Sequence, residues 1–239
     1  MNSRVVKIRE NERKSHIEIY KNEALYSSDS WLGKPIKTVK DIMPYFQENK
    51  SLRVLDLGCG VGRNSIYIAD KCASKECQID CVDILEIAID NLQKNANEHS
   101  VSNIIHGFVD TIEHFPITKD TYDLIIAVSA LEHVESEEVF LRKLHEIKKG
   151  IKPDGIVCLV VNSEVREKRK DTDEELEPQF EVNLFSEELQ SYLDDIFSEF
   201  VTIKNTLSFQ EYDIPRDEIT SHLTTKVITY VGRRQMWII

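Results

Sequence analysis

Long apolar runs and an excess of basic residues are both missing from this sequence. No run approaches the roughly 20 apolar residues of a membrane-spanning helix, and the first residues lack the apolar stretch of a secretory signal. Lys and Arg number 30 against 42 Asp and Glu, which gives a net charge of −12. Nucleic acids and anionic membranes bind basic surfaces, so we expect neither as a partner.

Cysteine is scarce and is not arranged in pairs. The 239 residues include 5 cysteines, and none of them forms a C-x-x-C motif of the kind that binds zinc or exchanges disulfides. A chain of this length buries a sizeable core without metals or disulfides. We therefore expect no metal site, and reduced, mostly buried thiols in a cytoplasmic protein.

The middle of the sequence alternates short apolar runs with amphipathic stretches. Apolar residues at helical spacing follow Gly62, recur over 85–97, and recur again over 135–150. The apolar runs between them are rich in β-branched residues, as in strands buried on both faces; they cover 53–58, 79–84, 104–109, 122–128 and 155–161. Such strand–helix repetition predicts an α/β fold with a doubly wound, mostly parallel, Rossmann-like sheet.

The two ends of the sequence depart from this pattern. Residues 1–50 are predicted to form an N-terminal helical cap over the functional site, ahead of an α/β domain over 51–239. Beyond the fifth strand, a segment near 163–183 is predicted to be an exposed or mobile insertion, because 11 of the 14 residues from Glu164 to Glu177 are charged. We expect residues 1–32 and this insertion to flank the open face above the fourth and fifth strands.

The C-terminal part has a different pattern. A helical stripe begins near Ser186, and two strand-like runs follow at 200–214 and 224–234. Because no helix separates these two runs, they are predicted to pair as an antiparallel hairpin. The predicted sheet therefore has seven strands.

Three glycines at alternate positions give the sharpest functional signal. Gly58, Gly60 and Gly62 follow the first predicted strand and precede a helix, where a ligand can approach the backbone closely. Their G-x-G-x-G spacing differs from the G-x-G-x-x-G of dinucleotide sites, and Asp56 stands just before them. A carboxylate there repels a pyrophosphate and attracts a cation. We therefore expect S-adenosylmethionine, which carries an ammonium and a sulfonium but no phosphate, rather than NAD.

Two further aspartates end the next predicted strands. Asp83 is placed to accept hydrogen bonds from ribose hydroxyls, a role that suits NAD and S-adenosylmethionine alike. It is also placed to cap the helix over 85–97, and both roles stay open. Asp110 is placed either to accept from an adenine amino group or to serve as a turn aspartate.

Taken in order, these features resemble the motifs of the class I S-adenosylmethionine-dependent methyltransferases. The matching segments are VLDLGCGVGRNS, CVDI, VDTIEHF, YDLIIAVSALEHV and IKPDGIVCLVV, over roughly residues 50–162. The C-terminal helix and hairpin are similar to the antiparallel last strands of that family. The glycine motif and the W-x-G-K-P piece from Trp31 to Pro35 are similar to the branch that includes tellurite-resistance methyltransferases.

The resemblance implies a cofactor site at the carboxyl ends of the strands. Its members would be Asp56, Gly58, Cys59, Gly60, Asn64, Asp83, Ile84, Asp110, Thr111 and Ala127. In this assignment the glycine loop holds the methionine part, Asp83 holds the ribose, and Ile84 lies against the adenine, which Asp110 and Thr111 also contact. Ala127 and Ser129, at the end of the fourth strand, would lie near the methionine part, the substrate and the reaction centre.

Methyl transfer from a sulfonium is an in-line displacement that depends mainly on alignment and on exclusion of water. A general base is needed only if the acceptor must lose a proton. His133 is the best-placed candidate, with a structural hydrogen bond as its alternative role, and Glu132 is similar. Tyr26, Trp31 and Tyr212 are candidates to cover the substrate, with core packing as the alternative for the first two. The other histidines are interpreted as surface residues: His16, His99, His106, His114, His145 and His222.

The sequence therefore predicts a methyltransferase that modifies a small-molecule acceptor and releases S-adenosylhomocysteine. Two alternatives stay open. One is a nucleotide-dependent oxidoreductase, which the glycine spacing and Asp56 oppose; the other is a non-catalytic S-adenosylmethionine-binding protein, which would need a blocked acceptor pocket. A nucleic-acid methyltransferase is disfavoured by the charge and by the lack of an N/D-P-P-Y/F piece after the fourth strand. The acceptor stays undetermined, protein acceptors included, and we expect a monomer or homodimer.

Overall fold

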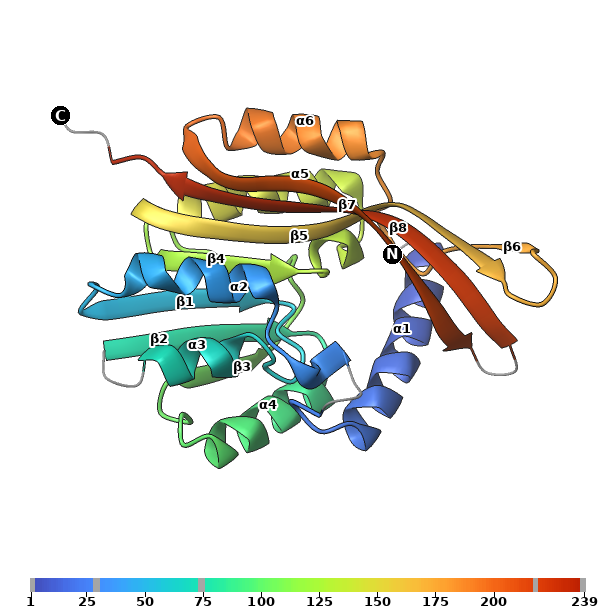
Figure 1. Cartoon of the computed structure of the whole chain (residues 1–239), viewed down its shortest axis with the longest axis horizontal. Coiled ribbons are helices and arrows are strands. Elements are labelled where there is room, and N and C mark those ends of the chain that lie inside the picture. Colours follow the sequence, from blue (N-terminus) through green and yellow to red (C-terminus); the bar gives the residue numbers. More distant parts are fainter. Residues whose placement is uncertain (1–2, 28–30, 73–75, 217–218, 237–239) are drawn as a thin grey trace.

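One mixed sheet runs through the chain. The computed structural model describes residues 3–27, 31–72, 76–216 and 219–236 (Figure 1). The strands are β1 (Ser51–Leu57), β2 (Glu76–Asp83), β3 (Ile105–Val109), β4 (Tyr122–Val128), β5 (Ile151–Arg169), β6 (Glu175–Leu176), β7 (Phe200–Arg216) and β8 (Ile219–Arg234). Their order is β3-β2-β1-β4-β5-β8-β7, and the short β6 pairs with β5. Strands β1 to β5 are parallel neighbours, whereas β8 is antiparallel to β5 and β7 to β8. The predicted fold is confirmed, with β6 as an additional strand.

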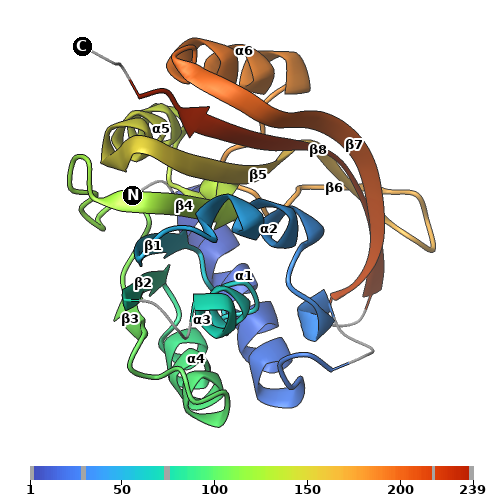
Figure 2. The same ribbon diagram turned by 60° about the vertical axis from the view of Figure 1, so that its left-hand side comes forward.

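Helices cover both faces of this sheet (Figure 2). They are α1 (Ser3–Asn22), α2 (Lys37–Ile42), α3 (Ser65–Cys72), α4 (Glu86–Glu98), α5 (Glu137–Gly150) and α6 (Ser186–Ile196), with single 3-10 turns η1 (Trp31–Gly33), η2 (Met43–Phe46) and η3 (Leu131–His133). Successive side chains of a strand point to opposite faces. Val54 of β1 accordingly packs in the core beneath α2, α3 and α4, and Leu55 packs in the core beneath α5 and α6.

Helix α5 illustrates why the predicted helices form where they do. Ser136 precedes its first turn, and its Oγ accepts a hydrogen bond from the backbone N–H of Val139 at 3.3 Å. Acidic residues occupy the first turn and Lys148 and Lys149 the last, which complements the helix dipole.

The predicted cap over residues 1–50 is too long. Val39, Ile42 and Phe46 pack in the same core as Leu52 and other sheet residues, so α2 and η2 belong to the α/β domain. The part before them packs on the domain through a smaller core, in which Tyr20 and Leu32 join Val61, Leu85 and Ala88. Within that part, α1 buries Val5, Ile8 and Tyr20. None of the helices in the described ranges, α1 included, is long and apolar enough to cross a membrane.

The prediction of an exposed or mobile insertion near 163–183 is wrong for the first part of that segment. The segment begins as regular strand, because β5 continues to Arg169 and stays paired with β8. Val165 and Glu167 are buried on one side of this extension, and Ser221 Oγ donates a 2.5 Å hydrogen bond to Glu167. The alternation of buried and exposed residues could not be recognised in the sequence, because Glu167, one of the buried positions, is a charged residue. Beyond it, the chain turns and returns as β6.

We expect Val165→Ala to lower the free energy of unfolding by about 1–3 kcal/mol, because it removes methyl groups from a buried strand position. Arg166→Ala, at the exposed neighbouring position, is the matched control and should cost less than about 0.5 kcal/mol. Urea denaturation measures both. Equal and negligible effects would mean that the segment is an insertion without packed structure.

Candidate active site

The glycine loop lies between β1 and α3, at the carboxyl ends of the parallel strands. Val82 O of β2 accepts hydrogen bonds from Gly58 N at 2.8 Å and Cys59 N at 3.0 Å, which fixes the start of the loop. Gly58 has φ +73°, and a Cβ there would lie 2.3 Å from Ala130 Cβ. At Gly60, φ is +53° and a Cβ would lie 2.9 Å from Oη of Tyr20. The middle of the loop is therefore a bare backbone surface that faces α1.

Asp56 lies beneath this loop and is only 1% exposed. Ser65 Oγ donates a hydrogen bond of 2.5 Å to its Oδ2. Burial raises the pKa of Asp56 to about 7, the negative charge of Asp83 acts in the same direction, and Ser65 and Arg63 oppose them. Direct contact of Asp56 with a ligand stays a prediction; in the structure its carboxyl group contacts Ser65 beneath the loop.

Asp83 ties the loop to the helix that follows it. Its Oδ2 accepts a 2.9 Å hydrogen bond from Gly60 N, and its Oδ1 accepts one of 2.9 Å from Leu85 N at the start of α4. Burial raises its pKa, and these two backbone bonds and His16 lower it. The bond to Leu85 N is a turn bond ahead of α4 and not a helix cap, because Leu85 is itself the N-cap residue and no side chain caps this helix. Contact with a ribose stays a prediction, since each carboxylate oxygen keeps a further lone pair.

Three more of the predicted cofactor residues surround Asp83. Ile84 is 49% exposed directly beside it. Asp110 N donates to Asp83 O at 3.1 Å, and Asp110 Oδ1 accepts from Thr111 N at 2.7 Å, so the turn role of this aspartate is also present. Contact of these residues with an adenine stays a prediction, but the fold brings them together.

Other predicted cofactor residues have their side chains turned away from the loop surface. Asn64 is buried, and its Oδ1 accepts from Ile36 N at 3.1 Å. Cys59 packs in the core beneath α3, and Ala127 is fully buried beneath α5. Any ligand contact by Ala127 would involve its backbone. Ser129 follows at the end of β4 with φ +50°, and its N–H donates to Val160 O at 2.8 Å.

The residues expected to cover the substrate have different roles in the structure. Tyr26 Oη donates to Arg63 O at 3.0 Å, and its ring packs edge-on against His99. It therefore holds the N-terminal segment to the end of the glycine loop. Tyr212 is 47% exposed on β7, and its hydroxyl is hydrogen-bonded to Gln210. The side chain of Trp31 lies outside the described residues.

Helix α1, part of the predicted N-terminal cap, covers the loop with residues that the sequence analysis did not single out. Tyr20 is buried over Gly60, and its ring centroid lies 5.6 Å from that of His16. Glu12, His16 and Tyr20 are four residues apart and so share one face of the helix. The interpretation of His16 as a surface residue is corrected, because its side chain is only 32% exposed and contacts both neighbours on this stripe. The four-residue spacing was the available signal.

Polar contacts dock α1 at both ends. Arg9 pairs with Glu113 and, at 3.3 Å, with Glu181, and it donates to His133 O at 3.3 Å. At the other end, Asn91 Nδ2 of α4 donates to Tyr20 O at 2.7 Å. Arg4, near the start of α1, contacts the segment over residues 177–181. Its partners there are the side chain of Glu177 and the backbone oxygens of Phe180 and Glu181. Helix α1 and residues 177–181 thus meet beside η3, above β4.

The structure does not support His133 as a general base. Its Nδ1 lies 3.0 Å from Glu181 Oε2, and its ring stacks on Phe180 with centroids 5.0 Å apart. Burial acts to lower its pKa, but the Glu181 hydrogen bond and the charges of Glu132 and Glu12 outweigh burial and raise it to about 9. At neutral pH the imidazole is therefore protonated and has no lone pair with which to accept a proton.

Glu132 is no better placed as a base. It is 1% exposed, and its Oε1 accepts from Asn162 N at 3.1 Å and from Asn162 Nδ2 at 2.5 Å. Burial raises its pKa, while its other oxygen, Oε2, finds no partner among the described residues. It joins η3 to Asn162, in the middle of β5.

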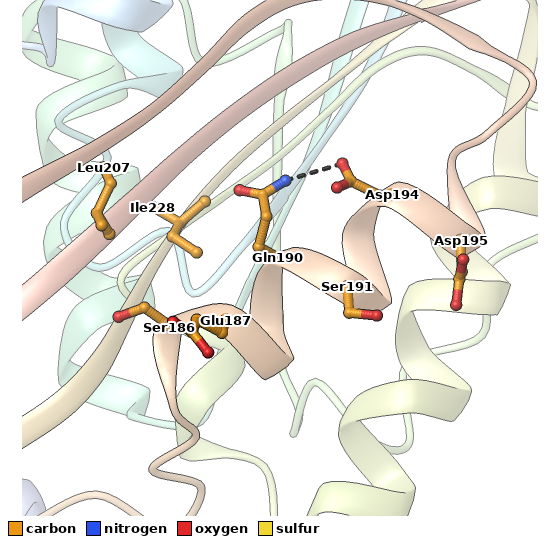
Figure 3. A pocket seen from close by; sticks show the side chains of 8 residues that line it. All are labelled: Ser186, Glu187, Gln190, Ser191, Asp194, Asp195, Leu207 and Ile228. Atoms are coloured by element: carbon orange, nitrogen blue, oxygen red, sulfur yellow. Dashed lines mark hydrogen bonds between the residues drawn. The ribbon is translucent and has the colours of Figure 1, made fainter.

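A groove of about 570 Å³ lies elsewhere, between α6 and the hairpin (Figure 3). It is lined by Ser186, Glu187, Gln190, Ser191, Asp194, Asp195, Leu207 and Ile228. No predicted site residue is among them, and its rim is acidic. The groove is therefore separate from the glycine loop.

Comparison with known proteins agrees with this geometry. Residues 54–155 match the family model of a methyltransferase domain. The ubiquinone biosynthesis O-methyltransferase of Rickettsia canadensis is 30% identical over 121 residues, 51% of this chain and 47% of that protein. The (S)-coclaurine N-methyltransferase of Thalictrum flavum subsp. glaucum is 32% identical over 104 residues, 44% of this chain and 27% of that protein. The chain spans half or less of the length of these curated relatives.

Solved structures show the same fold. TehB from Haemophilus influenzae superposes with a TM-score of 0.60 over 82% of this chain and 62% of its own, at 19% sequence identity. That likeness establishes the fold and not the branch, so the closer resemblance to tellurite-resistance enzymes stays a prediction. Residues 54–155 of this chain therefore match a methyltransferase domain, within a fold that the solved structures share.

The ion pair of His133 makes a prediction for stability. Its pKa is about 9 in the folded chain against 6.5 for an ordinary histidine, so its protonated form stabilises the fold. This contribution is fully present below about pH 6.5 and is lost as the pH rises through about 9. We expect His133→Gln to lower the free energy of unfolding at pH 6 and to have a much smaller effect at pH 9.5. Urea denaturation at the two pH values tests this, and a difference independent of pH would refute it.

Proposed function

We propose that this chain transfers the methyl group of S-adenosylmethionine to a small-molecule acceptor. One observation carries the proposal: the bare backbone at Gly60 is bonded directly to the carboxylate of Asp83 and lies above that of Asp56. Two carboxylates around a glycine loop repel the pyrophosphate of a dinucleotide and attract an ammonium or a sulfonium. The nucleotide-dependent oxidoreductase is disfavoured for the same reason.

The residues at the loop fit this cofactor. The backbone from Gly58 to Gly60 and the overlying Tyr20 would hold the methionine part, and Asp83 would hold the ribose. The exposed Ile84 and the turn of Asp110 and Thr111 would hold the adenine. When bound, the cofactor supplies a methyl group activated by positively charged sulfur.

The chain's own contribution is alignment and exclusion of water. Helix α1 covers the loop, and its contacts with Glu113 and Glu181 fix it over the end of β4. Protonated His133 is a fixed positive charge on the acceptor side. The same cover is what the non-catalytic alternative would need, and turnover of an acceptor separates the two.

The names of the relatives support a small organic acceptor, since they include both O- and N-methyltransferases. All 5 cysteines are buried and none is in a disulfide in the described ranges, where all of them lie; this supports the proposed cytoplasmic setting. The proposal includes a monomer or homodimer as the working assembly.

Calorimetric titration with S-adenosylhomocysteine and with NAD tests the cofactor. We expect binding of the first and none of the second. Asp83→Asn should weaken S-adenosylhomocysteine binding by roughly 1.5–3 kcal/mol, or about 10- to 160-fold, because it replaces a charged hydrogen-bond acceptor. Asp90→Asn, at an exposed position of α4, is the control and should leave affinity unchanged. Micromolar NAD binding without heat from S-adenosylhomocysteine would overturn the proposal.

A further inference from the structure

His16 is held in one defined tautomer. Its Nδ1 lies 2.9 Å from the backbone oxygen of Glu12 and 3.4 Å from Glu12 Oε2. A carbonyl oxygen only accepts hydrogen bonds, so Nδ1 carries the hydrogen. The lone pair of the neutral ring is therefore on Nε2, which makes no hydrogen bond in the part of the chain that the structure describes.

His16 lies on α1 between the glycine loop and η3. Glu12 and Tyr20 flank it on α1, and Asp83 faces it from the end of β2, where the charge of His16 lowers the carboxylate's pKa. The charge of Glu12 acts both on Tyr20 and on His133. The stripe on α1 thus runs from the glycine loop, where the cofactor is expected, to η3 on the acceptor side.

His16 and His133 are opposites in their capacity to accept a proton. His133 has its Nδ1 on a carboxylate and is protonated at neutral pH. His16 has its Nδ1 2.9 Å from the carbonyl oxygen of Glu12, with the carboxylate of Glu12 farther away at 3.4 Å, and its Nε2 makes no hydrogen bond within the described ranges. A base must have a free lone pair within reach of the proton that it removes, and of these two side chains only His16 offers one.

We propose that His16 Nε2 is the general base for an acceptor with an O–H or N–H group, and that Glu12 is its positioning residue. The proposal rests on the proposed methyltransferase function. The acceptor's lone pair forms a bond to the methyl carbon, the carbon–sulfur bond breaks, and sulfur keeps that electron pair. The acceptor's proton goes to Nε2, so a neutral ring becomes an imidazolium and the charge lost by sulfur is retained in the site.

A histidine footprint tests the placement without any acceptor. Diethyl pyrocarbonate attacks the neutral imidazole, and modified peptides identify each histidine by mass spectrometry. At pH 7 we expect His16 to react and His133, with about 1% of the neutral form, to react about 100-fold more slowly than an unprotonated ring. Saturating S-adenosylhomocysteine should slow the modification of His16 and leave His145, exposed on α5, unchanged. If His16 is unreactive, or reacts equally with and without S-adenosylhomocysteine, the proposal is wrong.

Kinetics test the role. His16→Asn keeps an N–H donor near the Nδ1 position but removes the base, so with catechol and secondary-amine probe acceptors we expect kcat to fall about 10²–10⁴-fold. The rise of rate with pH should disappear, and S-adenosylhomocysteine affinity should stay close to that of the natural chain. His145→Asn is the matched control. Glu12→Gln should lower kcat and shift the pH profile without a comparable change in KM, as expected of a positioning residue.

The outcomes separate this inference from the function on which it rests. Failure of the natural chain to bind S-adenosylhomocysteine contradicts the proposed function itself. Binding and turnover that survive intact in His16→Asn, with an unchanged pH profile, contradict only the role of His16. If no probe acceptor is methylated, the footprint alone decides whether His16 lies in the site.

Discussion

The carboxylate of Asp83 holds the glycine loop and the start of α4 in one arrangement. One of its oxygens accepts from Gly60 N and the other from Leu85 N. A buried carboxylate without such partners is costly, so burial and hydrogen bonding together fix the position of the loop relative to β2. The exposed Ile84 and the turn at Asp110 follow from that position, since both adjoin the same strand end. The rest of the proposed cofactor site depends on this one bridge.

Helix α1 closes the site by a different physical means. It buries few apolar residues, and its contacts with the domain are largely ion pairs and hydrogen bonds, such as those of Arg9 with Glu113 and Glu181. A helix that buries few apolar residues opens locally at a smaller cost in free energy than the sheet beneath it. That property suits a cover over a site that must admit a cofactor and an acceptor in each turnover.

Sequence reasoning succeeded where a local pattern determines the structure. The parallel strands, the hairpin and the glycine loop all followed from periodicity and from glycine spacing. It failed where a tertiary contact decides. The extension of β5 was missed because Glu167 is a charged residue type, yet its side chain is buried and accepts a hydrogen bond from Ser221. His133 could be either a base or a structural residue from the sequence, because its partner, Glu181, is 48 residues away. His16 was interpreted as a surface residue because only the docking of α1 brings its charge close enough to act on Asp83.

The central claim is that a ligand binds at the glycine loop beneath α1. Amide hydrogen exchange with and without S-adenosylhomocysteine tests it most directly, because exchange reports local opening along the whole backbone. The account predicts slower exchange in the loop over 56–64, at 83–85 and 109–112, and along α1 from Arg9 to Tyr20, with no change in α6. Protection confined to α6 and the groove beside it, or exchange in α1 that is unaffected while the loop is protected, would contradict the account.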